Sequence, residues 1–179
     1  PEQVKELFHR TVDTGLQHGT VTVLMDKEGY EVTTYRVDGD YEDGRHPKQV
    51  MFTSSLEEDL KRRDFTINAM AYHPVRGLVD LFHGMEDMQA KIIRCVGNPM
   101  ERFHEDALRI LRAVRFSAQL GFTIEKETKS GIRALAPNLK CVSAERIQTE
   151  LVKLLASPHP DYLRVAYETG ITKEFLPEF

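Results

Sequence analysis

Residues 103–116 read FHEDALRILRAVRF, and this stretch carries the clearest helical pattern of the chain. At about 100° per residue, five apolar side chains of this stretch and the residues just after it fall within one stripe. The stripe consists of Ala107, Ile110, Leu111, Val114 and Ala118. The opposite half carries four charged residues at intervals of three, which are Asp106, Arg109, Arg112 and Arg115. The spacing predicts one continuous helix over 100–119 with a buried stripe and a charged face.

Two interpretations of the charged face stay open at this point. The first is a solvated face with ion pairs three or four residues apart, each worth a few tenths of a kcal/mol. The second is a site for phosphates or base edges, which forked guanidinium donors hold well. Glu105 and Asp106 are the only acids on this stretch, so they leave at least one of its three arginines without a local partner. This imbalance favours the second interpretation.

A carboxylate close to an arginine can also select a nucleotide base. Asp accepts a hydrogen bond from an exocyclic amino group, and Arg donates one to a neighbouring ring acceptor. Cytosine and adenine present that pair of groups, whereas guanine and uracil present a carbonyl beside an N–H. A buried mismatch of this kind is costly. We therefore predict that Asp106 and Arg109 select C and A and reject G and U without a nucleic-acid template.

A second charged segment reads KRRDFTINAMA (61–71). It predicts a short helix that begins at Asp64 or Thr66, since both residue types cap helix N-termini. Arg62 and Arg63 are then either surface charges ahead of a helix, or one of them is directed at a triphosphate near the helix start. The segment by itself favours neither interpretation.

The remaining pattern predicts mixed structure first and helices afterwards. The expected elements up to residue 98 are a helix over 1–10, strands over 21–25 and 31–37 around a turn at 26–29, a polar loop over 38–47, a strand at 50–52, a helix over 56–60 and strands over 78–81 and 92–96. The later helices are expected over 125–135, 143–156 and 158–168. This shift predicts an α+β fold with a domain boundary after residue 98.

Glu31 is the candidate metal ligand of the N-terminal part. It shares one strand face with Thr33 and Tyr35, because side chains alternate along a strand. A glutamate among threonines is usually a solvated position. It becomes a catalytic ligand only beside further carboxylates, because two-metal phosphoryl-type transfer needs several convergent oxygens.

Composition excludes several classes of protein. The 179 residues contain 29% charged residues and a formal net charge of -4, which is typical of a globular chain and argues against binding nucleic acid through overall charge. No apolar run approaches the roughly 18 residues of a membrane span. Cys95 and Cys141 have neither zinc nor redox spacing. We therefore expect a cytoplasmic protein with no membrane partner.

Several ordered segments together resemble the class II tRNA nucleotidyltransferases, the CCA-adding enzymes, whose sister group is the bacterial poly(A) polymerases. The segments are QHGT (17–20), EVTTYR (31–36), DGRHP (43–47), KRRDFTINAMA (61–71), HEDALRILRAVRF (104–116) and VSAERI (142–147). The resemblance implies a nucleotidyltransferase head with a palm-like mixed β-sheet over 1–98. An all-α neck that recognises the nucleotide base follows over 99–179.

The resemblance also implies roles for individual residues. Asp106 and Arg109 match the pair that templates the incoming base. The arginines that match positions around the nucleotide and its phosphates are Arg63, Arg112 and Arg115, with Asp64, Asn68 and Glu105 in support. Glu31 matches an acidic position near the metal site. The loop 38–47 resembles the segment that helps to switch from C to A addition.

The implied activity is template-independent addition of CCA to tRNA 3′ ends from CTP and ATP, with Mg²⁺ as the metal. The family's first motif, a glycine-rich strand and turn that ends in Asp-x-Asp, is absent from these residues, as are the domains that bind the tRNA acceptor end. We therefore expect an internal portion of a longer enzyme that is inactive by itself. The alternatives are a poly(A) polymerase of the same family and a non-catalytic nucleotide- or RNA-binding module.

Overall fold

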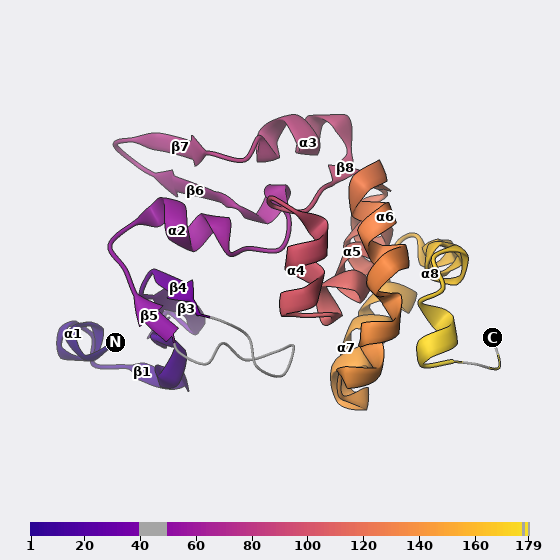
Figure 1. Ribbon diagram of the computed structural model, residues 1–179. Helices are drawn as coiled ribbons and strands as arrows, with labels where there is room; N and C mark the ends of the chain where they lie inside the picture. Colours follow the sequence, from indigo (N-terminus) through magenta and orange to yellow (C-terminus); the bar gives the residue numbers. More distant parts are fainter. Residues whose placement is uncertain (40–49, 177, 179) are drawn as a thin grey trace. The chain divides into compact units, whose positions relative to one another are not determined.

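The computed structural model describes residues 1–39, 50–176 and 178 (Figure 1). These residues fold into two compact units. Unit 1 comprises residues 1–39 and 50–62, and unit 2 comprises the described residues from Arg63 onward. The loop expected over 38–47, to which the resemblance gives the C-to-A switch, lies outside the described residues apart from its first two positions. The division into head and neck after residue 98 stays a prediction.

Unit 1 contains two small antiparallel sheets and two short helices. Its elements are α1 (Glu2–Leu7), β1 (Thr11–Gly15), a 3₁₀ turn (Leu16–His18), β2 (Thr20–Met25), β3 (Glu28–Thr33), β4 (Arg36–Asp38), β5 (Val50–Phe52) and α2 (Leu56–Lys61). The first sheet has the order β1-β2-β3, and β4 pairs with β5 in the second. Strand β1 was not expected, because its short run of threonine and valine continues a segment with helical spacing.

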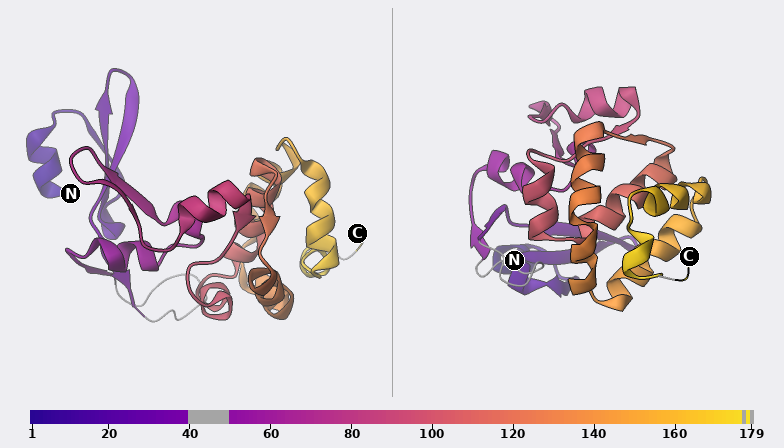
Figure 2. Two further views of the ribbon diagram at one scale, coloured as in Figure 1. Left: turned by 90° about the horizontal axis from the view of Figure 1, so that it is seen from above. Right: turned by 45° about the vertical axis from the view of Figure 1, so that its right-hand side comes forward.

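The β2–β3 hairpin, drawn in purple in Figure 2, has a shorter loop than its sequence indicates. Met25 pairs with Glu28, so the loop contains only Asp26 and Lys27, whose φ angles are 48° and 72°. Two-residue loops with positive φ at both positions match the right-handed twist of the flanking strands. The return strand therefore begins at Glu28 and ends at Thr33, which corrects the expected single strand over 31–37.

Unit 1 has little buried apolar surface. Val21 and Val23 lie on one face of β2 and are 0% and 2% exposed, and Leu60 of α2 is also buried. Every residue of β3 is exposed. The sheet is therefore covered by described residues of the chain only around the middle of β2.

Unit 2 begins with a hairpin and continues into a group of helices. Its elements are a 3₁₀ turn (Thr66–Asn68), β6 (Met70–His73), β7 (Gly77–Asp80), α3 (Gly84–Ala90), β8 (Ile92–Ile93), α4 (Pro99–Glu105), α5 (Leu108–Leu120), β9 (Thr123–Ile124), α6 (Lys126–Leu135), a 3₁₀ segment (Ala136–Cys141), α7 (Ala144–Leu155), a 3₁₀ turn (Pro160–Tyr162), α8 (Leu163–Glu168) and a last 3₁₀ turn (Thr172–Glu174). Strands β6 and β7 pair in antiparallel fashion, and β8 pairs with β9 in parallel.

Helix α5 organises the core of unit 2. It contacts α4, α7 and α8, and α4 in turn packs on α6 (Figure 1). The predicted apolar stripe is confirmed, since all five of its side chains are buried. Together with the smaller strands and helices, this arrangement confirms the expected α+β fold.

The segment after Asp64 does not form the expected helix. Phe65 is fully buried and bridges to Cys95, and the Thr66 N–H donates to the carbonyl of Arg94 at 2.9 Å. These backbone groups bond to a neighbouring extended segment, so only three residues form a 3₁₀ turn before β6 begins. The predicted N-cap at Asp64 or Thr66 is therefore wrong, and so is a phosphate site based on a helix N-terminus there.

The long helix expected over 100–119 is interrupted at Asp106. Helix α4 ends at Glu105, and Asp106 has extended backbone angles of φ -145° and ψ 104°. Its carboxylate accepts a hydrogen bond from the N–H of Leu108 at 3.0 Å, which gives the backbone an alternative to the helical bond. Asp106 therefore lies at a corner before α5 rather than on the same helix face as the arginines.

Candidate functional site

The arginines of α5 do not project from a solvated face. Arg112 donates to Oδ2 of Asp64 from Nε at 2.8 Å and from Nη2 at 2.6 Å. Asp64 is 8% exposed and also accepts the backbone N–H of Phe65 at 2.9 Å. The acid that Arg112 lacks on its own helix thus comes from a segment far away in the sequence.

Arg115 is held even more closely. It is 8% exposed, and its Nε donates to Oε2 of Glu150 on α7 at 2.7 Å. Its Nη1 donates to Gln119 at 2.7 Å, and its guanidinium lies 3.6 Å from the ring centroid of Phe116. This burial contradicts the solvated-face interpretation at Arg115. Arg112 and Arg115 thus find no acid within their own stretch, as expected, but Asp64 and Glu150 supply acids from distant segments.

Asp106 and Arg109 are adjacent but have separate side-chain partners. The backbone N–H of Arg109 donates to the carbonyl of Asp106 at 3.0 Å. The Asp106 carboxylate accepts Nη2 of Arg146 at 2.8 Å in addition to the N–H of Leu108. Arg146 comes from α7 and belongs to the VSAERI segment, so this helix fixes the orientation of the Asp106 carboxylate.

Arg109 is oriented by the end of α4. Its Nη1 donates to Oε2 of Glu105 at 2.6 Å and to the carbonyl of Arg102 at 3.2 Å. Glu105 also binds Arg102 through its other oxygen. Glu105 therefore lies between two guanidinium groups, and its supporting role toward a nucleotide stays a prediction.

The segment that contains Arg63 and Asn68 packs close to the same helix. Asn68 donates from Nδ2 to Oδ1 of Asp64 at 3.3 Å, and Arg63 donates from Nη1 to the carbonyl of Asn68 at 3.3 Å. Phe65 meets Phe116 edge to face at 5.8 Å between ring centroids. The structure thus places the predicted nucleotide-site residues of unit 2 in two contact groups along α5, one at its start and one at Arg112 and Arg115. Their roles toward a nucleotide stay predictions.

Glu31 belongs to the other unit of the chain. It lies in β3 of unit 1, is exposed and pairs with Thr22 of β2. Among the residues that the structure describes, no three His, Cys, Asp or Glu side chains are grouped as a metal site requires. A hard cation such as Mg²⁺ is usually bound by one or two carboxylates with further oxygens. A site shared with the phosphates of a nucleotide is therefore not tested by this finding, and the magnesium expectation stays a prediction.

Sequence reasoning missed Glu150 as a site residue. Glu150 is 4% exposed and shares the buried side of α7 with Ile147 and Leu154. The signal was available, because an acid three residues after Ile147 and four before Leu154 falls on the apolar stripe of that helix. Charged residues are almost never fully buried without a partner, so a buried basic partner was to be expected.

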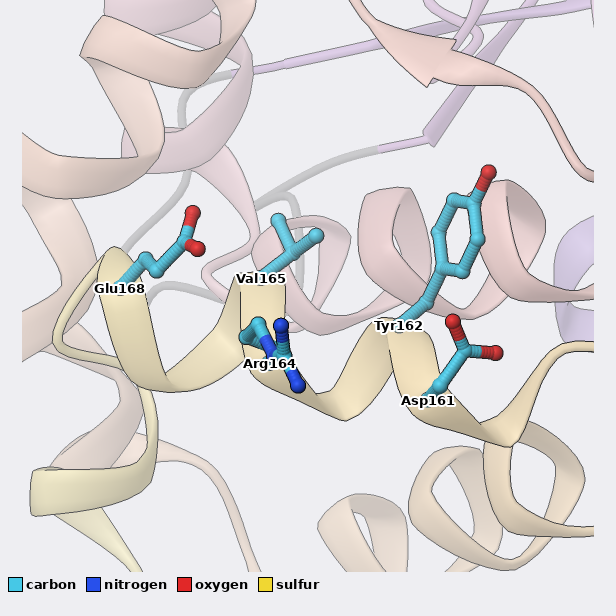
Figure 3. Close-up of a pocket in the computed structure, with 5 residues that line it drawn as sticks. All are labelled: Asp161, Tyr162, Arg164, Val165 and Glu168. Atoms are coloured by element: carbon cyan, nitrogen blue, oxygen red, sulfur yellow. The ribbon is translucent and has the colours of Figure 1, made fainter.

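A shallow pocket of about 230 Å³ lies elsewhere, along the 3₁₀ turn Pro160–Tyr162 and α8 (Figure 3). Its lining residues are Asp161, Tyr162, Arg164, Val165 and Glu168. All of them come from one short stretch of chain, whereas ligand sites usually enclose their ligand between elements. None of the predicted site residues lines this pocket.

No helix in the described part of the chain is long and apolar enough to cross a membrane. This finding concerns helices of that part only.

Two family profiles match the chain. The first is described as the poly A polymerase head domain and matches residues 1–94. The second is described as a probable RNA and SrmB-binding site of polymerase A and matches residues 121–179. The first match spans more than half of the chain.

Individual proteins and solved structures also match the chain. A CCA-adding enzyme of Leuconostoc mesenteroides is 58% identical over 155 residues, which are 87% of this chain and 39% of the relative. A crystal structure of the Bacillus stearothermophilus CCA-adding enzyme in complex with CTP is 44% identical and has a TM-score of 0.87. The match covers 96% of this chain and 41% of the Bacillus stearothermophilus chain.

A third relative is a crystal structure of a tRNA nucleotidyltransferase complexed with a primer tRNA and an incoming ATP analog. It is 29% identical, has a TM-score of 0.79 and covers 99% of this chain and 51% of that chain. The chain therefore spans only about two fifths to one half of the length of these three relatives. By its head-domain profile and its relatives, the chain belongs to the family of tRNA nucleotidyltransferases and poly(A) polymerases.

Proposed function

We propose that the complete protein containing this chain adds CCA to tRNA 3′ ends with CTP and ATP as substrates. The relatives named CCA-adding enzymes support this proposal, as do the solved relatives in complex with CTP or with tRNA and an ATP analog. In the reaction, the RNA 3′ hydroxyl oxygen forms a bond to the α-phosphorus while the bond to pyrophosphate breaks. The 179 residues by themselves remain predicted to be inactive.

The observation that carries the proposal is the corner at Asp106 and Arg109. A carboxylate offers about four lone-pair positions. The Asp106 carboxylate uses one for Leu108 and one for Arg146, so it retains capacity for an exocyclic amino group. Arg109 follows on the first turn of α5 and supplies guanidinium donors for a ring acceptor. This pair suits cytosine and adenine and is mismatched to guanine and uracil.

Arg112 is the arginine of α5 best suited to a phosphate. Its side chain is 33% exposed, whereas the side chain of Arg115 is 9% exposed. Its contact with Asp64 fixes the guanidinium without covering it. We therefore assign Arg112 and Arg63 to the triphosphate and give Arg115 an indirect part.

Magnesium is the metal that we propose for the complete protein, with Glu31 as one candidate ligand. The site would need carboxylates beyond those that the structure describes. A cytoplasmic location is supported by Cys95 and Cys141, which are both unbridged thiols.

Base selection gives the direct test. We expect Asp106→Ala to reduce the preference for CTP over UTP by about tenfold or more, while the affinity for the shared triphosphate changes less. Nucleotide affinities for CTP, ATP, GTP and UTP would be measured by calorimetry on the complete protein. Glu101→Ala, an exposed acid on α4, is the matched control. An unchanged preference in Asp106→Ala would refute the assignment.

Poly(A) polymerase activity is the second candidate, because both matching profiles carry the name of that enzyme. Supplying CTP, ATP and a tRNA that ends before CCA to the complete protein separates the two activities. Incorporation of two C residues and one A supports CCA addition. Long runs of A on unrelated RNA would support the polymerase instead.

A further inference from the structure

The buried carboxylate of Glu150 has no part in the base selection or phosphate contacts proposed above. It lies on α7, is 4% exposed and faces two arginines of α5. Its Oε2 accepts Nε of Arg115 at 2.7 Å, and its Oε1 lies 3.9 Å from Nη1 of Arg112. One carboxylate therefore borders both the buried Arg115 and the partly exposed Arg112.

Arg115 cannot move without breaking several contacts at once. Beyond Glu150, Gln119 accepts its Nη1 at 2.7 Å, and the Phe116 ring covers one face of its guanidinium. A buried, charged group with fixed partners is held firmly, because leaving it unpaired is costly. Arg115 and Glu150 thus form a fixed pair inside the helical unit.

Arg112 borders that pair on one side of its guanidinium group. Asp64 binds its Nε and Nη2, and Glu150 faces its Nη1. The two acids come from different elements, so the guanidinium is hydrogen-bonded to the 63–68 segment on one side and borders the α7 carboxylate at 3.9 Å on the other. Moving Glu150 would change the charge and packing beside Nη1, while the two hydrogen bonds to Asp64 remain.

We infer that Glu150 is a positioning residue for nucleotide binding, which holds Arg112 in the orientation that meets the triphosphate. This inference rests on the proposed function, because it assumes that Arg112 contacts the phosphates. Glu150 itself touches no substrate. Its contribution comes through geometry, since a negative charge near an anion site by itself opposes anion binding.

Two variants separate geometry from charge. Glu150→Asp keeps the charge and shortens the side chain, whereas Glu150→Gln keeps the shape and removes the charge. If Glu150 positions Arg112, both variants weaken the binding of CTP and ATP by about tenfold, because small misplacements of a binding group have large effects. The ratios of CTP to UTP and of ATP to GTP stay the same, since Asp106 and Arg109 have other partners.

The experiment is calorimetric titration of the complete protein with each nucleotide, together with thermal unfolding of every variant. Glu145→Gln is the matched control, because Glu145 is exposed on the same helix. Tighter nucleotide binding by Glu150→Gln together with normal binding by Glu150→Asp would show that Glu150 acts only through its charge. This result would overturn the inference. A lower melting temperature with unchanged affinities would make it purely structural and would also overturn it.

A milder variant covers the case in which both changes at Glu150 prevent folding. Gln119→Ala removes the second partner of Arg115 from the partly exposed end of the pair. The inference expects a smaller loss of affinity for both CTP and ATP, and an unchanged affinity would overturn it. Failure of the unsubstituted protein to bind any nucleotide would instead refute the proposed function, so the two failures are distinguishable.

Discussion

The sheet of unit 1 leaves all of β3 exposed, whereas the helices of unit 2 enclose a continuous core. In the described part of unit 1 the buried apolar side chains are Val21, Val23 and Leu60. The main buried cluster runs from Phe65 to Ile171 and lies entirely in unit 2. Small structures with little buried apolar surface have little to offset their conformational entropy.

The same difference separates the candidate residues. Glu31 lies on an exposed strand of unit 1, where it pairs with Thr22 of β2. Asp64, Asp106 and Arg112 lie in unit 2, where each is bound by partners that are themselves anchored in the core. The comparison teaches that the candidate nucleotide site is organised by a core, while the candidate metal ligand is not.

The largest expected effect tests whether the core of unit 2 carries its stability. Phe103 belongs to α4, is fully buried and faces Gly131 of α6. Phe103→Ala should lower the free energy of unfolding by about 3–5 kcal/mol, because it leaves a cavity. Urea unfolding followed by circular dichroism measures this loss. Leu7→Ala, at a residue of unit 1 that is 77% exposed, should change it by less than about 0.5 kcal/mol. Equal losses of unfolding free energy in the two variants would contradict the difference between the two units.

A smaller effect tests how closely α4 and α6 pack. A Cβ at Gly131 would lie 2.9 Å from Cβ of Pro99 and 3.3 Å from the Phe103 ring. Gly131→Ala should therefore cost about 1–3 kcal/mol. In an exposed helix the same change would stabilise by up to about 1 kcal/mol. Ser130→Ala, at the exposed neighbouring position, is the control in the same unfolding assay. A stabilised Gly131→Ala protein would show that the helices are further apart.

The next effect depends on pH. Burial raises the pKa of Glu125, but the N–H groups of Glu127 and Thr128, the Thr128 hydroxyl and the charge of Arg94 together hold it below its ordinary value of 4.5. Because the folded-state pKa is the lower one, the carboxylate stabilises α6 above pH 4.5 and loses this contribution as the pH falls through the folded-state pKa.

Glu125→Ala should therefore cost about 1 kcal/mol at pH 7, as loss of a helix cap does. The difference from the unsubstituted protein should shrink when unfolding is measured at about pH 3. Glu127→Ala, at an exposed position next to it, serves as the control. A difference that grows on acidification would contradict the sign of the shift.

The smallest expected effect is a difference in reactivity between two cysteines of unit 2, which is measured without a substitution. Burial raises the pKa of Cys95 to about 12, and the residue is 3% exposed, whereas Cys141 is exposed. At pH 8 an alkylating reagent should modify Cys141 and leave Cys95 unmodified, because the thiolate is the reactive form. Mass spectrometry of the peptides measures both. With rising urea, modification of Cys95 should follow the unfolding of unit 2, and early modification would indicate a loose core.

Much of the candidate site was predictable from local pattern. The apolar stripe around Ile110 and the base-selecting pair Asp106 and Arg109 were identified from spacing and chemistry. Helix α7 was expected over 143–156 and is found at Ala144–Leu155. The stripe and the helix are confirmed because helical periodicity is a property of short segments, whereas the base-selecting role of the pair stays a prediction.

The sequence by itself determined which residues form the apolar stripe of α5 and which motifs resemble a known family. Only the tertiary structure decided that the chain turns at Asp106, that Thr66 follows an extended bridge, and that Asp64 and Glu150 supply the acids for the arginine row. The physical reason is that buried charges and backbone groups take partners from segments distant in the sequence, so their pairing depends on how those segments pack.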